Sequence, residues 1–548
     1  MYKKNTRRKS GIGVRQKRNA TRLGGRKSKP TDHRLPKGER AFGARRATRD
    51  TYDREKEIDK ILKAHEIERE FSVAAMMDAE NARLDDISRR DMTEQYAITI
   101  DGADAKDFDD AVYLCKVPEG YALSVHIADV SAYVKHKSAL DREAYSRGTS
   151  VYYPNGVVPM LPEILCNDLC SLKPNEVRPT LSVDMTFDYY GELIKFDIYE
   201  AFIKSHARLT YNEAEDILNG AHIKDRELET MLFDMRELSK ILKRKRSERG
   251  AIDFNTAETG FVLDDNGEVA DLYAKKNGES NSIIEEFMLA TNEVVAEYMT
   301  SKEVPCVYRV HEPPDEDKLD AFKTFISACG INYVKQKNIS KSLRRVIDAA
   351  KDTKYAGVIS EVMIRSMQKA KYAAVNLGHF GLQSKYYCHF TSPIRRYPDL
   401  VVHRILKAYL NDRLDAKTIE RFKTFVNEAS YASSEREYAA LIAERDIDDL
   451  FKAEYASKHI GERFNGIISG VTEFGIFVEL ENSVEGLIFK EMLPRDKYIF
   501  KQDLYALVGR NNVFKLGDEM EVVIESVSEH KYIRMVPFTK KDVTNQKA

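Results

Sequence analysis

The sequence of 548 residues has no tryptophan and only six cysteines. None of the cysteines forms a CxxC pair, and Cys166/Cys170 has no second half that would complete a zinc site. We therefore expect reduced thiols in a cytoplasmic protein, because disulfides are rare in that compartment. No apolar run approaches the ~20 residues that a membrane-spanning helix needs. The N-terminus has no apolar segment behind its basic residues, which argues against a secretory signal and predicts a protein without a membrane contact.

The charge of the chain is segregated, although its formal sum is only −1. Of the 87 basic and 88 acidic residues, 18 and 3 lie in residues 1–50, which leaves 69 and 85 in the remainder. Because residues 1–50 also hold few apolar side chains, we predict a disordered basic arm that binds polyanions, joined to an acidic globular body. A solvated tail with no dedicated partner is the alternative.

One short stretch, ITIDGADAKDFDDAV at residues 98–112, concentrates acidic side chains. Its four carboxylates, with only Lys106 as a nearby countercharge, belong to Asp101, Asp107, Asp109 and Asp110. Carboxylates this close repel one another and raise each other's pKa unless a positive charge lies among them. A bound cation is the usual remedy, and an all-oxygen ligand set suits Mg²⁺, with Mn²⁺ as a substitute. The alternative is a solvated acidic turn.

The flanks of this stretch favour the metal site over the solvated turn. Residues 97–100 and 112–115 are apolar and partly β-branched, which predicts two strands that hold the acidic segment rigidly. If the DFDD run is extended, Asp107 and Asp109 share one face and Asp110 points away from it.

A second informative stretch, HFTSPIRRYPDLVVHR at residues 389–404, places Arg395 and Arg396 shortly after Pro393. An arginine on a rigid turn binds a phosphate through two parallel hydrogen bonds, which a lysine cannot do. Metal ions would then polarise a phosphate from one side and the guanidinium from another. A salt bridge between domains is the alternative that these residues leave open.

Hydrophobic periodicity divides the rest of the chain into helical, mixed and all-β parts. Two hairpins are predicted, 112–117 with 121–130 and 181–187 with 192–199. Predicted helices cover 284–299, 316–329, 340–351, 358–377, 398–411 and 416–457. Five short predicted strands, which indicate a closed barrel of the OB type, cover 463–470, 474–480, 484–488, 519–527 and 530–536.

Three phenylalanines of the predicted barrel are candidates for nucleic-acid binding. Phe464, Phe474 and Phe477 lie where such barrels present aromatic rings for stacking on bases. The alternative is that these rings fill the barrel, since buried phenylalanine is common.

Six motifs occur in the order seen in the ribonuclease II / ribonuclease R family, and the bacterial ribonuclease R branch is the most similar. They are TIDGADAKDFDDAV, SVYYPNGVVPMLPEILCNDLCSL, RGAIDF, IIEEFMLATNE, YRVHEPPD and HFTSPIRRYPDLVVHR. The C-terminal GERFNGIISGVTEFGIFVELENSVEGLI resembles the S1 RNA-binding domain of that family. The resemblance runs from about residue 56 to 537. It implies a Mg²⁺-dependent, processive 3′→5′ exoribonuclease that hydrolyses single-stranded RNA to nucleoside 5′-monophosphates, in RNA degradation and quality control.

The resemblance also implies that the chain divides into five segments. These are a basic disordered arm (1–50), a helical connector (51–95), an α+β RNB catalytic domain (96–412), a helical linker (413–460) and an all-β S1 domain with the OB fold (461–540).

The resemblance also implies roles for individual residues. Asp101, Asp107, Asp109 and Asp110 match the family's metal-site carboxylates. Asp109 matches the position at which substitution abolishes cleavage and spares RNA binding. Arg395 matches the arginine that holds the scissile phosphate.

Aromatic and ribose contacts are implied in the same way. Tyr152, in preference to its neighbour Tyr153, and Phe254 match the pair of rings that clamps the 3′-terminal bases. Tyr211 and Glu285 match groups near the terminal ribose, where a 2′-hydroxyl distinguishes RNA from DNA.

The chain departs from the ribonuclease R pattern at both ends. Only residues 1–90 precede the catalytic domain, too few for two cold-shock-like domains, so the basic arm would take over electrostatic binding of RNA; a truncated or mis-assigned start is the alternative. Residues 539–548 stand where the family has a long basic tail. We expect single-stranded RNA as the partner and a monomer, and leave open contacts with the ribosome, a helicase or degradosome components. A catalytically silent RNA-binding scaffold and an endonuclease are the rival functions.

Overall fold

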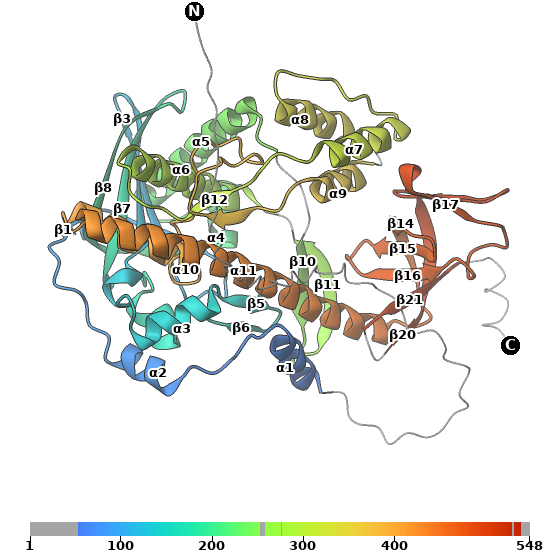
Figure 1. Cartoon of the computed structure of the whole chain (residues 1–548), viewed down its shortest axis with the longest axis horizontal. Helices are drawn as coiled ribbons and strands as arrows, with labels where there is room; N and C mark the ends of the chain where they lie inside the picture. The colour runs from blue at the N-terminus through green and yellow to red at the C-terminus, as the bar shows by residue number, and fades with distance from the viewer. Residues whose placement is uncertain (1–52, 253–257, 276, 354, 529–530, 539–548) are drawn as a thin grey trace, which may run out of the picture. The chain divides into compact units, whose positions relative to one another are not determined.

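The computed structural model of the chain describes residues 53–252, 258–275, 277–353, 355–528 and 531–538 (Figure 1). The predicted basic arm at 1–50 lies outside the described residues. In the part of the chain that is described, every helix is too short or too polar to cross a lipid bilayer. All six cysteines are free thiols, and four of them are buried.

The largest sheet of the described residues has seven strands in the order β1-β8-β7-β4-β3-β2-β9, and its strands β3, β7 and β8 are seen at the left of Figure 1. Pairing is antiparallel except at the two edges, where β1 lies parallel to β8 and β9 lies parallel to β2. The strands are β1 (Arg90–Asp91), β2 (Ile98–Asp101), β3 (Asp110–Val117), β4 (Gly120–Ala128), β7 (Val177–Asp188), β8 (Leu193–Lys204) and β9 (Ala207–Thr210). Both predicted hairpins, β3–β4 and β7–β8, are confirmed.

Gly120 shows why the turn between β3 and β4 needs a glycine. Its φ is +148°, and a Cβ at this position would lie 2.1 Å from the carbonyl oxygen of Phe187 on the neighbouring strand β7. Only a residue without a side chain allows the two backbones to approach this closely.

Two helices pack on the sheet, and a long third helix connects the α+β part to the C-terminal barrel. α5 (Arg226–Arg249) and α6 (Glu279–Ser301) contact each other, and they contact β3 and β4 respectively. α11 (Ala416–Lys458) is 43 residues long and leads into the barrel (Figure 1). The other helices are α1 (Arg54–Ala64), α2 (Val73–Glu80), α3 (Ala139–Arg147), α4 (Tyr211–Leu218), α7 (Glu316–Ala328), α8 (Ile339–Ala350), α9 (Ala356–Ser366) and α10 (Tyr397–Leu410).

The predicted helix at 358–377 is wrong in its second half. α9 ends at Ser366, and Met367 already has extended backbone angles (φ −72°, ψ 158°). Beyond it, β13 (Lys371–Ala373) pairs antiparallel with β12 (Tyr308–Val310), a strand that precedes it by some sixty residues. Pairing with a distant strand overrides the local helical pattern, as tertiary contacts commonly do. Two further hairpins that periodicity missed are β5 (Val151–Tyr153) with β6 (Gly156–Val158) and β10 (Glu258–Leu263) with β11 (Val269–Lys275).

The predicted barrel is confirmed as a closed five-stranded barrel with the order β14-β15-β16-β21-β20. Its strands are β14 (Arg463–Val471), β15 (Gly475–Leu480), β16 (Glu485–Phe489), β20 (Glu519–Val527) and β21 (Ile533–Pro537). An insertion between β16 and β20 forms a separate three-stranded sheet, β17 (Ile499–Lys501), β18 (Ala506–Val508) and β19 (Val513–Lys515), which the sequence analysis did not predict.

Candidate active site

The acidic stretch forms a loop between two neighbouring strands of the sheet. Asp101 is the last residue of β2 and Asp110 is the first residue of β3. Residues 102–109 between them are not in a strand, so the simple alternation of faces does not apply to Asp107 and Asp109. The Ser171 hydroxyl holds the loop, because it accepts the N–H of Phe108 (3.1 Å) and donates to the carbonyl oxygen of Lys106 (2.7 Å).

Asp109 meets the arginine stretch although 285 residues separate them in sequence. Its carboxylate is buried, Oδ1 accepts the backbone N–H of Ile394 (2.9 Å), and Oδ2 lies 3.7 Å from Nε of Arg395. The Arg395 side chain remains 42% exposed, and its Nη2 donates to Oγ of Ser392 (3.0 Å). A guanidinium with free donors beside a buried carboxylate is arranged to bind an anionic ligand.

The neighbouring arginine has a structural role, although its ion pair is local and is not the salt bridge between domains that the sequence left open. Arg396 donates from Nε and Nη2 to both carboxylate oxygens of the buried Asp399, at 2.9 and 2.7 Å. Oδ1 of Asp399 also accepts the N–H of Ser392. This closed set of hydrogen bonds stiffens the turn that presents Arg395.

The segment from Asp101 to Asp110, which we call the aspartate loop, has more carboxylates than nearby cations to balance them. Burial, followed by the charges of Asp110 and Asp107, raises the pKa of Asp101 to about 8. Burial also raises the pKa of Asp110 to about 6, despite Arg395, and holds the pKa of Asp109 well above its usual range. Oδ2 of Asp101 is buried and has no hydrogen-bond partner among the described residues. Buried oxygens that lack a counterion fit a hard divalent cation, which Asp101, Asp107, Asp109 and Asp110 would hold.

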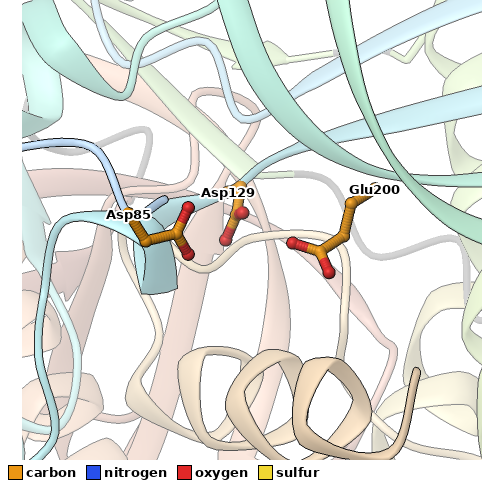
Figure 2. Close-up of side chains that lie close together, drawn as sticks. All are labelled: Asp85, Asp129 and Glu200. Atoms are coloured by element: carbon orange, nitrogen blue, oxygen red, sulfur yellow. The ribbon is translucent and has the colours of Figure 1, made fainter. Parts of the chain in front are cut away.

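A different acidic group satisfies a purely geometric test for a metal site. Within the described ranges, one set of three acidic side chains has ligand atoms all within 4.8 Å of one another: Asp85, Asp129 and Glu200 (Figure 2). Two buried cations already lie among these oxygens. Lys407 Nζ is 2.8, 2.6 and 3.5 Å from the three carboxylates, and Arg89 Nη2 is 2.5, 2.8 and 3.7 Å from them. This buried charge cluster therefore has its counterions, and we assign it a structural role.

We expect Lys407→Met to destabilise the protein by about 3–5 kcal/mol, because it leaves two buried carboxylates and one half-buried carboxylate with one cation. Burial opposes the charge of Asp129, but the charge and hydrogen bond of Lys407 outweigh it and lower the pKa of Asp129 to about 2. The urea midpoint of unfolding measures the loss. Lys423→Met removes an exposed lysine that is paired with Glu420, so it serves as the control. A loss for Lys407→Met no larger than for the control would contradict the structural role.

Tyr152 lies beside the aspartate loop, as its assignment requires. Its hydroxyl donates to Oδ2 of Asp107 (2.8 Å), and its backbone N–H donates to Oε1 of Glu444 on α11 (2.9 Å). The side chain is 41% exposed, so the ring has a surface open to a ligand. Tyr153 instead contacts Arg69, at 5.8 Å from the guanidinium carbon to the ring centre. The predicted partner ring, Phe254, lies outside the described residues.

The two predicted ribose contacts are placed differently. Tyr211 is the first residue of α4, directly after β9, and burial followed by the charges of Asp110 and Asp101 raises the pKa of its hydroxyl. The tyrosine is therefore close to the aspartates. Glu285, on α6, is 54% exposed and lies 3.7 Å from Arg246 on α5. This ion pair connects Glu285 to α5 and not to the aspartate loop.

The three barrel phenylalanines differ in exposure. Phe474 is 42% exposed, whereas Phe464 and Phe477 are half-buried. The rings of Phe474 and Phe477 meet edge to face with their centres 6.3 Å apart. Phe464 packs against the ring of His459. Phe474 has the ring surface that base stacking needs, and Phe464 packs against the core of the barrel. Phe477 alternates with the buried Ile476 and Val478, so its ring lies on the outer face of β15.

Sequence reasoning missed Arg208, which holds the other end of the aspartate loop. Its Nη2 donates to the carbonyl oxygens of Gly102 (2.7 Å) and Ala103 (2.9 Å), and its guanidinium lies 5.5 Å from the ring centre of Phe108. Arg208 reaches the loop because β9 pairs with β2. No local pattern around residue 208 signals this pairing, so the sequence carried no usable sign of it.

Comparison with known proteins agrees with this fold. Residues 89–412 match the RNB domain, and residues 457–535 match the S1 RNA binding domain. The chain therefore belongs to the RNB-domain family, on its ribonuclease R branch.

Named relatives and solved structures extend the comparison. Ribonuclease R of Thermotoga maritima is 42% identical over 448 residues, which cover 80% of this chain and 63% of that protein. The chain thus spans somewhat less than two thirds of the length of this relative. The structure of Mycoplasma genitalium RNase R in complex with ribose methylated single-stranded RNA is 31% identical, covers 89% of this chain and 78% of that chain, and has a TM-score of 0.85. Yeast Ssd1, a pseudonuclease, covers 83% of this chain and 58% of its own with a TM-score of 0.63 at 22% identity, which is a likeness of fold alone.

Proposed function

We propose that this chain is a Mg²⁺-dependent exoribonuclease that processively hydrolyses single-stranded RNA from its 3′ end to nucleoside 5′-monophosphates. The observation that carries the proposal is the group of buried and half-buried carboxylates in the aspartate loop, which has few countercharges, with the guanidinium of Arg395 beside Asp109. Mn²⁺ is the expected substitute, since it accepts the same oxygen ligands.

In this proposal the chain's own residues bind and orient the 3′ end. Arg395 donates to the non-bridging oxygens of the scissile phosphate, and the N–H of Ile394 keeps the Asp109 carboxylate in place beside it. A bound divalent ion supplies a water of lowered pKa and neutralises the negative charge that develops on phosphate oxygens. Arg208 and Ser171 hold the loop so that its carboxylates do not have to rearrange during the reaction.

Recognition of RNA would combine aromatic stacking with contacts to the ribose. The exposed ring of Tyr152 stacks on a 3′-terminal base while its hydroxyl stays on Asp107, which couples base binding to the loop. Stacking tolerates every base, at about 1–3 kcal/mol per base. Tyr211, next to the aspartates, and Glu285 are proposed ribose contacts, and Phe474 of the S1 domain is a proposed stacking platform.

The experiment that tests the proposal follows poly(A) labelled at its 3′ end and, separately, at its 5′ end, with Mg²⁺ or with EDTA. We expect labelled mononucleotide from the 3′ label, a short end product from the 5′ label, and no reaction in EDTA. RNA that is bound but unchanged would indicate a scaffold without catalysis, and internal fragments would indicate an endonuclease. Restoration of the activity by Mn²⁺ after EDTA treatment checks the cofactor.

A further inference from the structure

The inserted sheet β17–β19 differs in charge from the barrel that carries it. Residues 490–515, which contain the sheet and its loops, hold six basic and three acidic residues. By contrast, the barrel residues hold one basic and four acidic residues over 463–489, and two basic and five acidic residues over 516–538. We call residues 490–515 the basic sheet. A barrel with this excess of acidic side chains repels phosphates, so the attraction of the S1 domain for a polyanion resides in the basic sheet.

The strand register places two of its lysines on one face. Lys501 and Lys515 both pair with Ala506 of the central strand, from opposite sides. Residues that face each other across neighbouring strands share a face of the sheet, and both lysines are exposed. The adjoining row on this face contains Ile499 and Val513, which are 62% and 45% exposed. The face thus combines spaced cations with accessible apolar surface.

One carboxylate holds the end of the basic sheet in a defined shape. Asp496 accepts the backbone N–H groups of Lys497 (2.7 Å), Arg510 (3.0 Å), Asn511 (2.8 Å) and Asn512 (3.1 Å). These hydrogen bonds join the loop before β17 to the turn between β18 and β19, and they hold the pKa of Asp496 well below its usual range. The carboxylate of Asp496 is therefore hydrogen-bonded to backbone N–H groups, and the cationic side chains of Lys497 and Arg510 lie at the same end of the sheet.

The cationic side chains of the basic sheet are available to a ligand. Lys497, Lys501, Arg510 and Lys515 are all exposed. Within the described part of the chain, no ion pair joins any of these four to an acidic side chain. This differs from the helical lysines Lys60, Lys318, Lys323 and Lys423, each of which pairs with an acid three residues away.

We propose that the basic sheet binds the phosphate backbone of single-stranded RNA, with the Asp496 hydrogen bonds presenting Lys497 and Arg510 at one end of the path and Lys501 and Lys515 along it. The proposal rests on the proposed function, because it takes RNA as the substrate, and it adds a charged surface to the stacking ring of Phe474. Spaced, unpaired cations match the regular phosphates of a strand, whereas an acidic protein offers no such repeat. The exposed ring of Phe474 on the same domain adds a stacking surface that an RNA strand can use and a polyanionic protein cannot.

The test compares two fourfold variants of the full chain in binding to fluorescent oligo(A), with EDTA present so that the RNA stays intact. The first variant is Lys497→Gln, Lys501→Gln, Arg510→Gln and Lys515→Gln. The control changes the paired lysines Lys60, Lys318, Lys323 and Lys423 to Gln, which removes the same net charge. We expect the first variant to raise Kd at least about tenfold and to reduce the slope of log Kd against log salt by about 2 to 3, since each phosphate contact on a single strand contributes about 0.7.

Two results would overturn the proposal. An equal change in Kd and salt slope for both variants would assign the effect to net charge alone. An unchanged Kd for the first variant, with an unchanged melting temperature, would show that the basic sheet does not bind RNA and would favour a protein as its ligand. Because affinity is measured without turnover, failure of this proposal is distinct from failure of the nuclease, which the cleavage assay reports.

Asp496→Asn tests whether RNA binding depends on the positions of Lys497 and Arg510 or only on the net charge of the basic sheet. The change removes a negative charge from the basic sheet, so attraction by net charge alone predicts tighter RNA binding. Loss of the hydrogen bonds that position Lys497 and Arg510 predicts binding that is weaker by several-fold. Weaker binding supports the proposed path, and tighter binding overturns the role of Asp496 in it.

Discussion

Asp109→Asn is expected to reduce turnover of single-stranded RNA by about 10³-fold or more, while its affinity for RNA stays within a few-fold. Asparagine has nearly the same shape as aspartate, and its Oδ1 can still accept the N–H of Ile394. The charge that would hold a divalent ion beside Arg395 is lost. Single-turnover cleavage of labelled poly(A) and binding in EDTA measure the two quantities separately.

The control for this prediction lies in the same loop. Asp104 is exposed, so Asp104→Asn removes the same charge without touching the proposed site. We expect the control to retain turnover. The Asp109→Asn protein should unfold at the same or a higher temperature, because burial already disfavours the charge of this carboxylate. A large loss of RNA binding or of thermal stability would assign Asp109 to folding and would contradict its catalytic role.

Arg395→Met is expected to lower the single-turnover rate by about 10²–10³-fold, because it removes the donors that would face the scissile phosphate in the proposed site. The side chain is 42% exposed and makes one hydrogen bond, to Ser392, but its removal also leaves the buried Asp109 carboxylate without its ion-pair partner. We therefore expect a loss of stability of about 1–3 kcal/mol. Binding of long RNA should weaken only slightly, since other contacts along the strand remain.

Arg395→Lys tests whether the planar guanidinium or only its charge is needed. Lysine keeps the charge but cannot form two parallel hydrogen bonds, so we expect a rate between those of Arg395→Met and the unaltered protein. Arg413→Met, at an exposed position after α10, is the control for loss of a basic side chain. Equal rates for Arg395→Met and the control would remove Arg395 from the proposed site.

These two predictions depend on a contact that the sequence could suggest but not establish. The acidic loop and the stretch with Arg395 were each recognisable from composition and local order. Their approach to 3.7 Å requires the turn at Ser392–Arg396 to lie against the loop between β2 and β3. The resemblance to ribonuclease R implied the partnership, and the backbone N–H of Ile394, which carries no sequence signal of its own, completes it.

Errors in the sequence reasoning came from long-range pairing. The helix predicted at 358–377 was cut short because Lys371–Ala373 found a strand partner in Tyr308–Val310. The buried charge cluster was missed for the same reason. Asp85, Asp129 and Lys407 are scattered along the chain, and each looks like an ordinary surface residue in its own segment.

By itself, the sequence determined the two long hairpins, most of the helices from residue 284 onward, the barrel, the concentration of carboxylates in one loop and the excess of basic residues at 490–515. These properties depend on neighbours within a few residues, where alternation, helical period and charge can be read directly. Only the tertiary structure decided that Arg208 and Arg395 reach the aspartate loop, that Arg396 is structural, and that Lys407 neutralises a second acidic group. Such contacts depend on which distant segments pair, and the free energy of that pairing is spread over the whole core.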